Sequence, residues 1–403
     1  MSTPSPASDP AGVSGPVPFA SPFAASGPEH VEEPVSYDGL LLAGFGGPEG
    51  QDDVIPFLRN VTRGRGIPDE RLEEVAHHYR HFGGVSPINA QNRALKAALE
   101  AELARRGIDL PVYWGNRNWA PYLEDAVQDA AAAGDTTLLA LATSAYSSFS
   151  SCRQYREDFA RVLTETGLGE RVTIDKVRQF FDHPGFVRPF VDGVEAAVST
   201  FVTDEGIAPE NVHVLFSTHS IPTADAQRSG PRDVDFGDGG AYAAQHLAVA
   251  QVVMDAVAAA VPAASGIPWE LVYQSRSGPP SQPWLEPDVC DVIADLPARG
   301  AEAVVIVPLG FVSDHMEVLW DLDTEAMEAA EEAGLRAIRS QTPGVDPAYV
   351  SGLVDLVQER LAGTKAGDRP HETPLGPWYD VCRPGCCENV RAGFKPAAAG
   401  IAP

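Results

Sequence analysis

Short apolar runs recur along this chain, each followed by a loop and a helical pattern, and this rhythm constrains the fold more than any other feature. The runs lie at 39–43, 112–114, 137–142, 172–177, 212–216, 269–274 and 304–307. Nearly continuous apolar strands are typical of parallel sheets that are buried on both faces. Four of these runs lie in the first half and three in the second, and we expect four strands in each half. The sequence therefore predicts an α/β fold of two similar doubly wound, Rossmann-like domains, with a cleft between the carboxyl edges of their sheets.

The two halves are flanked by segments of different composition. The 403 residues suffice for two domains of ordinary size, which we expect at 36–203 and 204–365. Residues 1–35 are rich in Pro, Ser, Ala and Gly without a basic start or a compact apolar segment, which predicts a disordered tail rather than a signal peptide. Residues 366–403 read as a polar C-terminal extension.

The acidic composition disfavours one class of partner. Lys and Arg number 29 against 56 Asp and Glu, a formal net charge of -27, so we expect no nucleic-acid binding. No apolar run reaches the roughly 18 residues that a membrane-spanning helix needs, and we expect a cytoplasmic protein. A dinucleotide site is not expected either, because Glu49 stands where the third glycine of a fingerprint starting at Gly44 should fall.

Two loops that follow buried strands carry the residues best suited to chemistry. His219 follows the run 212–216, and Glu317 follows 304–307, with His315 just before it. An imidazole and a carboxylate facing each other across a cleft can bind a divalent metal such as Fe(II), shuttle protons, or serve a hydrolase. These residues alone leave all three chemistries open.

Three carboxylates share one face of the helix predicted after the last apolar run. Glu317, Asp321 and Glu325 are spaced four residues apart. Like charges stacked in this way repel one another, and a chain tolerates that most readily where a cation arrives. The alternative is an ordinary solvated acidic face.

Three of the five cysteines crowd near the end of the chain, at Cys382, Cys386 and Cys387, whereas Cys152 and Cys290 lie in its body. In a cytosolic chain, clustered cysteines favour a metal over a disulfide. Three thiols are one short of a closed site, so the fold must supply a fourth ligand.

Several segments, taken together, resemble the signature segments of the ferrochelatase family, in that family's order and spacing. They are LLLAGFGGPE (40–49), RGRGIP (63–68), GGVSPI (83–88), DHPGFV (182–187), FSTHSIP (216–222), YQSRSGPPSQPWLEPDV (273–289) and VPLGFVSDHMEVLWDLD (307–323). The resemblance implies a chelatase-type fold and insertion of Fe(II) into a porphyrin without a redox cofactor in the chemistry.

The resemblance also implies roles for the residues around the two loops. His219 matches the family's histidine that accepts pyrrole protons and contacts iron, and Glu317 matches its essential glutamate on the opposite side of the ring. Asp321 and Glu325 would form the delivery path for Fe(II). Asp314 and His315 would orient Glu317 from behind.

For the porphyrin, the resemblance implies a cleft lined by Phe45, Ser86, Tyr155 and Trp284, with propionates held by Arg63 or Arg65. Ordinary core packing is the alternative for the aromatic residues. Relatives from low-GC bacteria carry a tyrosine at the position of Phe45 that can ligate iron. Phenylalanine cannot, so axial coordination would come from another group or from water.

The tail cysteines Cys382, Cys386 and Cys387 resemble the extension of ferrochelatases that carry a [2Fe–2S] cluster, and Cys152 lies where bacterial members supply an internal fourth thiolate. Zinc, or one spare thiol, is the alternative. Cys290 reads as a buried apolar residue.

The resemblance is strongest to the actinobacterial branch, whose members convert coproporphyrin III to coproheme, and we expect that substrate rather than protoporphyrin IX. A sirohydrochlorin-type chelatase and a non-enzymatic heme- or cluster-binding sensor are the other classes. A transient partner protein from heme metabolism is also expected.

Overall fold

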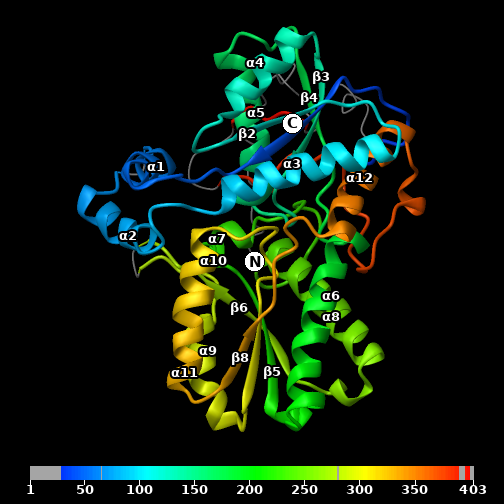
Figure 1. Ribbon diagram of the computed structural model, residues 1–403. Coiled ribbons are helices and arrows are strands. Elements are labelled where there is room, and N and C mark those ends of the chain that lie inside the picture. Colours follow the sequence, from blue (N-terminus) through cyan, green and yellow to red (C-terminus); the bar gives the residue numbers. More distant parts are fainter. Residues whose placement is uncertain (1–28, 65, 279–280, 390–394, 400–403) are drawn as a thin grey trace, which may run out of the picture.

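Two parallel sheets form the centres of two lobes that lie one above the other in the computed structural model (Figure 1). The structure describes residues 29–64, 66–278, 281–389 and 395–399. The first sheet has the order β2-β1-β3-β4 and the second the order β6-β5-β7-β8, with every pair parallel. The strands are β1 (Gly39–Gly44), β2 (Val112–Asn116), β3 (Thr137–Ala142), β4 (Thr173–Lys176), β5 (Val212–His219), β6 (Trp269–Gln274), β7 (Ala303–Val307) and β8 (Arg336–Arg339). The predicted fold is confirmed.

Helices cover both faces of each sheet. The α-helices are α1 (Val54–Val61), α2 (Asp69–His81), α3 (Ile88–Arg105), α4 (Leu123–Ala133), α5 (Gln154–Glu165), α6 (Pro184–Ser199), α7 (Thr223–Ala226), α8 (Gly240–Ala260), α9 (Val289–Asp295), α10 (Met316–Trp320), α11 (Met327–Glu332) and α12 (Pro347–Ala362). Three segments are π-helical, η3 (Phe149–Arg153), η4 (Thr200–Asp204) and η8 (Asp321–Ala326). Short 3-10 turns are η2 (Gln51–Asp53), η5 (Pro209–Asn211), η6 (Pro262–Ala264), η7 (Leu296–Arg299) and η9 (Ala366–Asp368).

The helix α8 is the longest apolar helix of the described chain. Its length and its mean hydropathy of 1.3 would allow it to cross a membrane, a property that core helices share. In the structure it packs against α6 and β6, and it buries the polar side chains of Gln245 and His246. These contacts are those of a core helix.

Two helices pack outside the lobe to which their position in the sequence would assign them. The helix α6, predicted within the half at 36–203, packs against α8 and β7 of the second lobe, and its Phe186 and Phe190 lie in a core that residues of both sheets share. The helix α12 instead packs against α3 and α6 at the junction (Figure 1). A Cβ atom at Gly185 would lie 2.5 Å from the carbonyl oxygen of Ala348, so α6 and α12 approach closely only at glycine. The lobe boundary therefore falls before α6.

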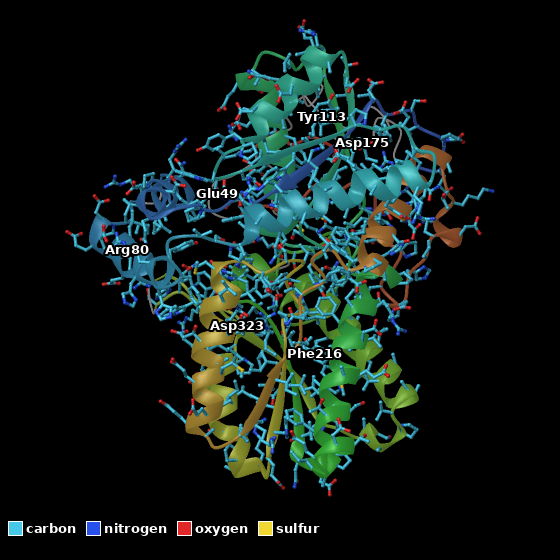
Figure 2. All side chains as sticks on the ribbon, in the orientation of Figure 1. Glu49, Arg80, Tyr113, Asp175, Phe216 and Asp323 are labelled. Carbon is cyan, nitrogen blue, oxygen red and sulfur yellow. The ribbon has the colours of Figure 1, made fainter. Side chains whose placement is uncertain are left out.

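The helices α1 and α2 form an arm that projects from the first lobe, with the labelled Arg80 on it (Figure 2). A small apolar core of its own holds the arm together, made of Val54, Phe57, Leu58, Leu72 and Ala76. In Figure 2, Phe216 of β5 lies inside the other lobe.

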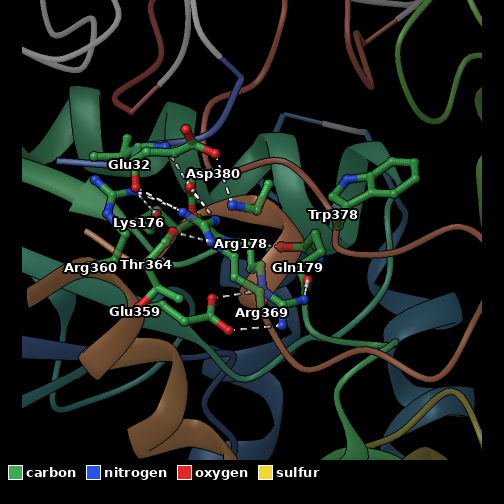
Figure 3. A network of polar contacts seen from close by, with 12 residues as sticks. Glu32, Lys176, Arg178, Gln179, Glu359, Arg360, Thr364, Arg369, Trp378 and Asp380 are labelled. Atoms are coloured by element: carbon green, nitrogen blue, oxygen red, sulfur yellow. Dashed lines mark hydrogen bonds and ion pairs between the residues drawn. The ribbon is translucent and has the colours of Figure 1, made fainter. Parts of the chain in front are cut away.

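Both ends of the described chain bind to the first lobe. Residues 29–35, which the sequence analysis includes in the N-terminal tail, pack against the C-terminal extension, and the amide of Val31 donates to Asp380 Oδ2 at 2.8 Å. Residues 1–28 lie outside the described residues. Arg178, Glu359, Arg369 and Asp380 form a buried polar network beneath this junction (Figure 3).

Candidate active site

His219 and Glu317 face each other where two neighbouring strands of the second sheet end. His219 is the last residue of β5, and Glu317 follows β7 at the start of α10. Strand order reverses between β5 and β7, and ligand sites of such sheets lie at this switch point. The His219 Nε2 and Glu317 Oε2 atoms are 3.6 Å apart, with side chains 33% and 50% exposed. His219 Nδ1 contacts the carbonyl oxygen of Ser220 and must donate to it, so Nε2 is the nitrogen that faces Glu317.

The two side chains fix each other's charge. Burial alone would lower the pKa of His219, but the Glu317 carboxylate outweighs this effect and raises the pKa to about 9. Burial alone would raise the pKa of Glu317, whereas His219 and, to a smaller extent, His315 hold it at about 2. The substrate-free site therefore contains an imidazolium–carboxylate pair at neutral pH.

The helix start that carries Glu317 is capped by His315. The His315 Nδ1 atom accepts from the Glu317 amide at 3.2 Å, so its lone pair is directed at the backbone. Burial lowers the pKa of His315, which favours this neutral form. The Asp314 carboxylate instead contacts Arg339 at 3.3 Å and Thr342 at 3.0 Å. Of the two residues predicted to orient Glu317, only His315 contacts it within the described chain.

The predicted stack of three carboxylates is interrupted, because the helix becomes π-helical after Trp320. Each carboxylate has its own partner: Glu317 faces His219, and Glu325 accepts from the indole nitrogen of Trp320 at 2.9 Å. Asp321 accepts from Ser275 and from Gln274 Nε2, the latter at 3.2 Å. Burial raises the pKa of Asp321 to about 7, against the opposing effect of the Ser275 hydrogen bond. Single π-turns of this kind are frequent at functional sites.

Gln274 connects these groups and was missed by the sequence analysis. It ends β6 directly beside His219 of β5. Its Oε1 atom accepts from Ser217 Oγ at 2.8 Å, and its Nε2 atom donates to the Glu317 carbonyl oxygen at 3.1 Å as well as to Asp321. A glutamine that ends an apolar strand was the signal available in the sequence.

Comparison with known proteins identifies the family. A family model described as Ferrochelatase matches residues 37–361. The chain belongs to the ferrochelatase family. Similar relatives include the coproporphyrin III ferrochelatase of Leifsonia xyli subsp. xyli, 69% identical over 93% of this chain and 97% of that protein. The coproporphyrin III ferrochelatase of Tropheryma whipplei is 57% identical over 91% and 93% of the two chains. Among solved structures, SirB from Bacillus subtilis with Fe3+ matches with a TM-score of 0.44 and 14% identity, over 84% of this chain and 100% of that one.

The residues expected to contact porphyrin in this ferrochelatase family member differ in exposure. Phe45 is 38% exposed, beside Phe57 of the arm at a ring distance of 6.4 Å. Trp284 is half-buried, and its backbone forms an isolated antiparallel β-bridge with Pro222, three residues after His219. Its buried indole N–H has no acceptor among the described residues. Ser86 is buried, and its amide donates to Pro48.

The other expected contacts are a buried tyrosine, an exposed arginine and an arginine outside the described residues. Tyr155 is 4% exposed and packs in the core of the first lobe, with the Arg117 guanidinium over its ring. This is the ordinary core packing that the sequence analysis gave as the alternative to porphyrin contact. Arg63 is exposed at the end of α1 and donates to Asn60 at 2.6 Å. Arg65 lies outside the described residues. Sequence reasoning missed Arg117, whose guanidinium lies 6.0 Å from the Phe45 ring and pairs with Asp158 at 2.5 Å.

The structure brings together the four cysteines that the sequence analysis grouped. Cys152, Cys382, Cys386 and Cys387 form one buried cluster, with the Cys386 and Cys387 sulfur atoms 3.8 Å apart. Cys290 is half-buried elsewhere, beside the core of the second lobe. Within the described ranges, no group of three or more His, Cys, Asp or Glu side chains is arranged around a single metal ion.

The surroundings of the cysteines suit a cluster that four thiolates hold. The amide of Gly230 donates to Cys387 Sγ at 3.2 Å. Hydrogen bonds from Cys152 and Cys386 lower the pKa of the Cys382 thiol well below its usual range, and the charges of Arg156 and Lys176 act in the same direction. The buried Nε atom of Arg156 has no acceptor among the described residues. A two-iron cluster needs two thiolates at each iron rather than four around one point, so this donor set fits it.

Proposed function

We propose that this chain inserts Fe(II) into coproporphyrin III, giving coproheme and releasing two protons to solvent. The observation that carries the proposal is the opposition of His219 Nε2 and Glu317 Oε2 at 3.6 Å, at the switch point of a ferrochelatase-family sheet. Two similar relatives named coproporphyrin III ferrochelatases support the choice of substrate. The exposed Arg63 and the neighbouring Arg65 are the proposed partners of the propionates.

In the proposed chemistry, binding of the metal ion at Glu317 makes His219 able to act as a base. His219 can accept a pyrrole proton only after it has lost its own, and the Glu317 carboxylate is what keeps it protonated. A divalent cation at Glu317 cancels that carboxylate charge, so the imidazole loses its proton to solvent through its exposed edge. The neutral Nε2 atom then accepts a pyrrole proton as iron enters the ring. Binding that bends the porphyrin exposes its nitrogen lone pairs.

We propose that Fe(II) binds in passing to the carboxylates of Glu325 and Asp321 before it reaches Glu317. Asp321 has a pKa near neutrality, about 7, so part of the population carries a proton that an arriving Fe(II) displaces. Its hydrogen bonds from Ser275 and Gln274 hold the carboxylate beside Glu317. Iron delivery should therefore weaken as the pH falls below about 7.

The test is anaerobic stopped-flow metallation with Fe(II), comparing coproporphyrin III with protoporphyrin IX. We expect faster turnover of coproporphyrin III in the wild-type protein. Glu317→Gln should slow metallation by about 100-fold or more while porphyrin binding, followed by fluorescence, is kept. Glu328→Gln, on the exposed face of α11, is the matched control. Wild-type metallation rates in Glu317→Gln would contradict the role of Glu317, and a preference for protoporphyrin IX would contradict the substrate.

We further propose that Cys152, Cys382, Cys386 and Cys387 hold a [2Fe–2S] cluster that ties the C-terminal extension to the first lobe. The burial of all four thiols in one group supports this proposal. Cys152→Ser should abolish the visible absorption of the purified protein, whereas Cys290→Ser should leave it unchanged. An intact cluster spectrum in Cys152→Ser would contradict the four-thiolate proposal.

A further inference from the structure

Two buried cations, Arg156 and Lys176, lie close enough to the cysteine cluster for their charges to lower the pKa of Cys382. Arg156 and Lys176 are each 1% exposed. Arg156 lies one turn after Cys152 on α5, and Lys176 ends β4. A buried charge is costly unless an opposite charge or a full set of hydrogen bonds compensates it.

The hydrogen bonds of both cations leave their charge largely uncompensated. Arg156 donates to the carbonyl oxygens of Ala399 and Asp380, and Lys176 donates to the carbonyl oxygen of Val177 at 3.1 Å and to Gln179 Oε1. These acceptors are neutral.

The nearby carboxylates are engaged with other cations. Asp175 pairs with Arg360, and Asp380 pairs with Arg369 at 2.5 Å. The largest favourable charge interactions of Arg156 are with Cys382 and Cys152. Cys152 is likewise the largest favourable charge partner of Lys176.

We infer that Arg156 and Lys176 are the buried counter-charges of the cysteine-held cluster and keep its reduction potential high. The inference rests on the proposed cluster. Four thiolates, two sulfides and two ferric ions carry a net charge of −2, which the two cations balance. One-electron reduction would convert one ferric ion to a ferrous ion and make the net charge −3, without breaking a bond. Net charge and hydrogen bonds to sulfur are known determinants of such potentials.

The experiment is a redox titration of the purified holoprotein with dithionite, followed by visible absorption and by electron paramagnetic resonance of the reduced cluster. Removing a buried cation disfavours the more negative reduced state. Arg156→Gln and Lys176→Gln should each lower the equilibrium constant for reduction at least about tenfold, a shift of about 59 mV to more negative potential. Arg161→Gln removes a half-exposed cation from the same helix and should leave the potential unchanged.

Arg156→Lys distinguishes the effect of the charge on the reduction potential from the effect of the side-chain contacts. The variant keeps the positive charge but not the guanidinium contacts with the extension. Its potential should stay near that of the wild-type protein. If Arg156→Gln folds but loses the cluster, and Arg156→Lys retains the cluster, that result also supports the inference. Wild-type potentials in both Gln variants would overturn it. A wild-type protein without a [2Fe–2S] spectrum would instead contradict the cluster itself.

Discussion

His219 takes its protonation state from one neighbour, which makes the candidate base dependent on the residue that would receive the metal. Burial and Glu317 act on the imidazole in opposite directions, and Glu317 prevails. An isolated histidine at the same strand end would be neutral at physiological pH and ready to accept a proton. The pair therefore keeps the base inactive until its carboxylate partner is occupied.

Glu317→Gln should lower the pKa of His219 from about 9 to below the ordinary value of 6.5, because burial then outweighs the smaller opposing effects of the Ser220 carbonyl and Asp321. Histidine NMR titration, with the His219 signal assigned from a His219→Asn variant, measures this shift. Glu328→Gln should leave the titration unchanged. A His219 pKa that stays near 9 in Glu317→Gln would show that another group holds the proton.

The same pair predicts a pH dependence of stability. His219 has a raised pKa in the folded state, so its stabilising contribution is complete below 6.5 and is lost as the pH rises through about 9. The Tm difference between the wild-type protein and Glu317→Gln should therefore shrink between pH 7 and pH 10. A difference that is constant over this range would contradict the ion pair. Above pH 4.5, the lowered pKa of Glu317 adds no further change.

At the scale of elements, the sequence predicted the strands whose ends carry the site but not the local geometry between them. Apolar runs located β5 and β7, and the loops after them located His219 and Glu317. The π-turn after Trp320 was missed, because a shift in backbone hydrogen bonding leaves the apolar periodicity nearly unchanged. The strand β8 was not located, since its sequence RAIR begins and ends with arginine.

Contacts between lobes escaped prediction for a related reason. Periodicity identifies the apolar face of α6 but not the sheet that this face covers. Likewise, the grouping of Cys152 with the tail cysteines came from resemblance to a family, since no spacing rule joins residues so far apart.

The arm formed by α1 and α2 contacts Trp320 at the end of α10 through aromatic side chains. The His78 ring stacks on Trp320 at 4.0 Å with an interplanar angle of 5°, and the rings of His77 and His81 lie edge-on to the same indole at 6.0 and 5.7 Å. Trp320 in turn donates to Glu325 of the proposed iron path. The position of the arm is therefore coupled to the start of that path.

His78→Ala should weaken this contact by about 0.5–1.5 kcal/mol, the usual value of an aromatic pair. Hydrogen exchange of the α2 amides should then rise about 2- to 10-fold, with no change in β5 or β7. Arg80→Ala, on the exposed face of the same helix, is the control for the altered helix propensity. Equal exchange in the two variants would mean that the stack does not hold the arm.

At the scale of the whole molecule, buried charges join the ends of the described chain to the first lobe, beside the apolar packing of Val31, Trp378 and Val381. Arg369 and Asp380 are neighbours in this network (Figure 3), and Arg369 donates to Asp380 and to the carbonyl oxygen of Val31. Arg360 contacts Tyr37 at 2.8 Å and Asp175. Because α12 supplies Arg360 and also packs against α6, this network links the extension to the junction of the lobes.

Asp380→Asn removes one anion from this network and leaves Arg369 buried without its carboxylate partner, which is 2.5 Å away in the wild-type protein. Breaking a buried pair on one side costs about 3–5 kcal/mol, so the free energy of unfolding in urea should fall by that amount. Proteolysis should cut the extension after 365 before it cuts either sheet, because the extension loses its anchor first. Glu205→Gln, which removes an exposed pair with Arg336, should cost less than about 1 kcal/mol. Similar small losses in both variants would mean that apolar packing around Trp378 and Val381, rather than buried charge, holds the extension in place.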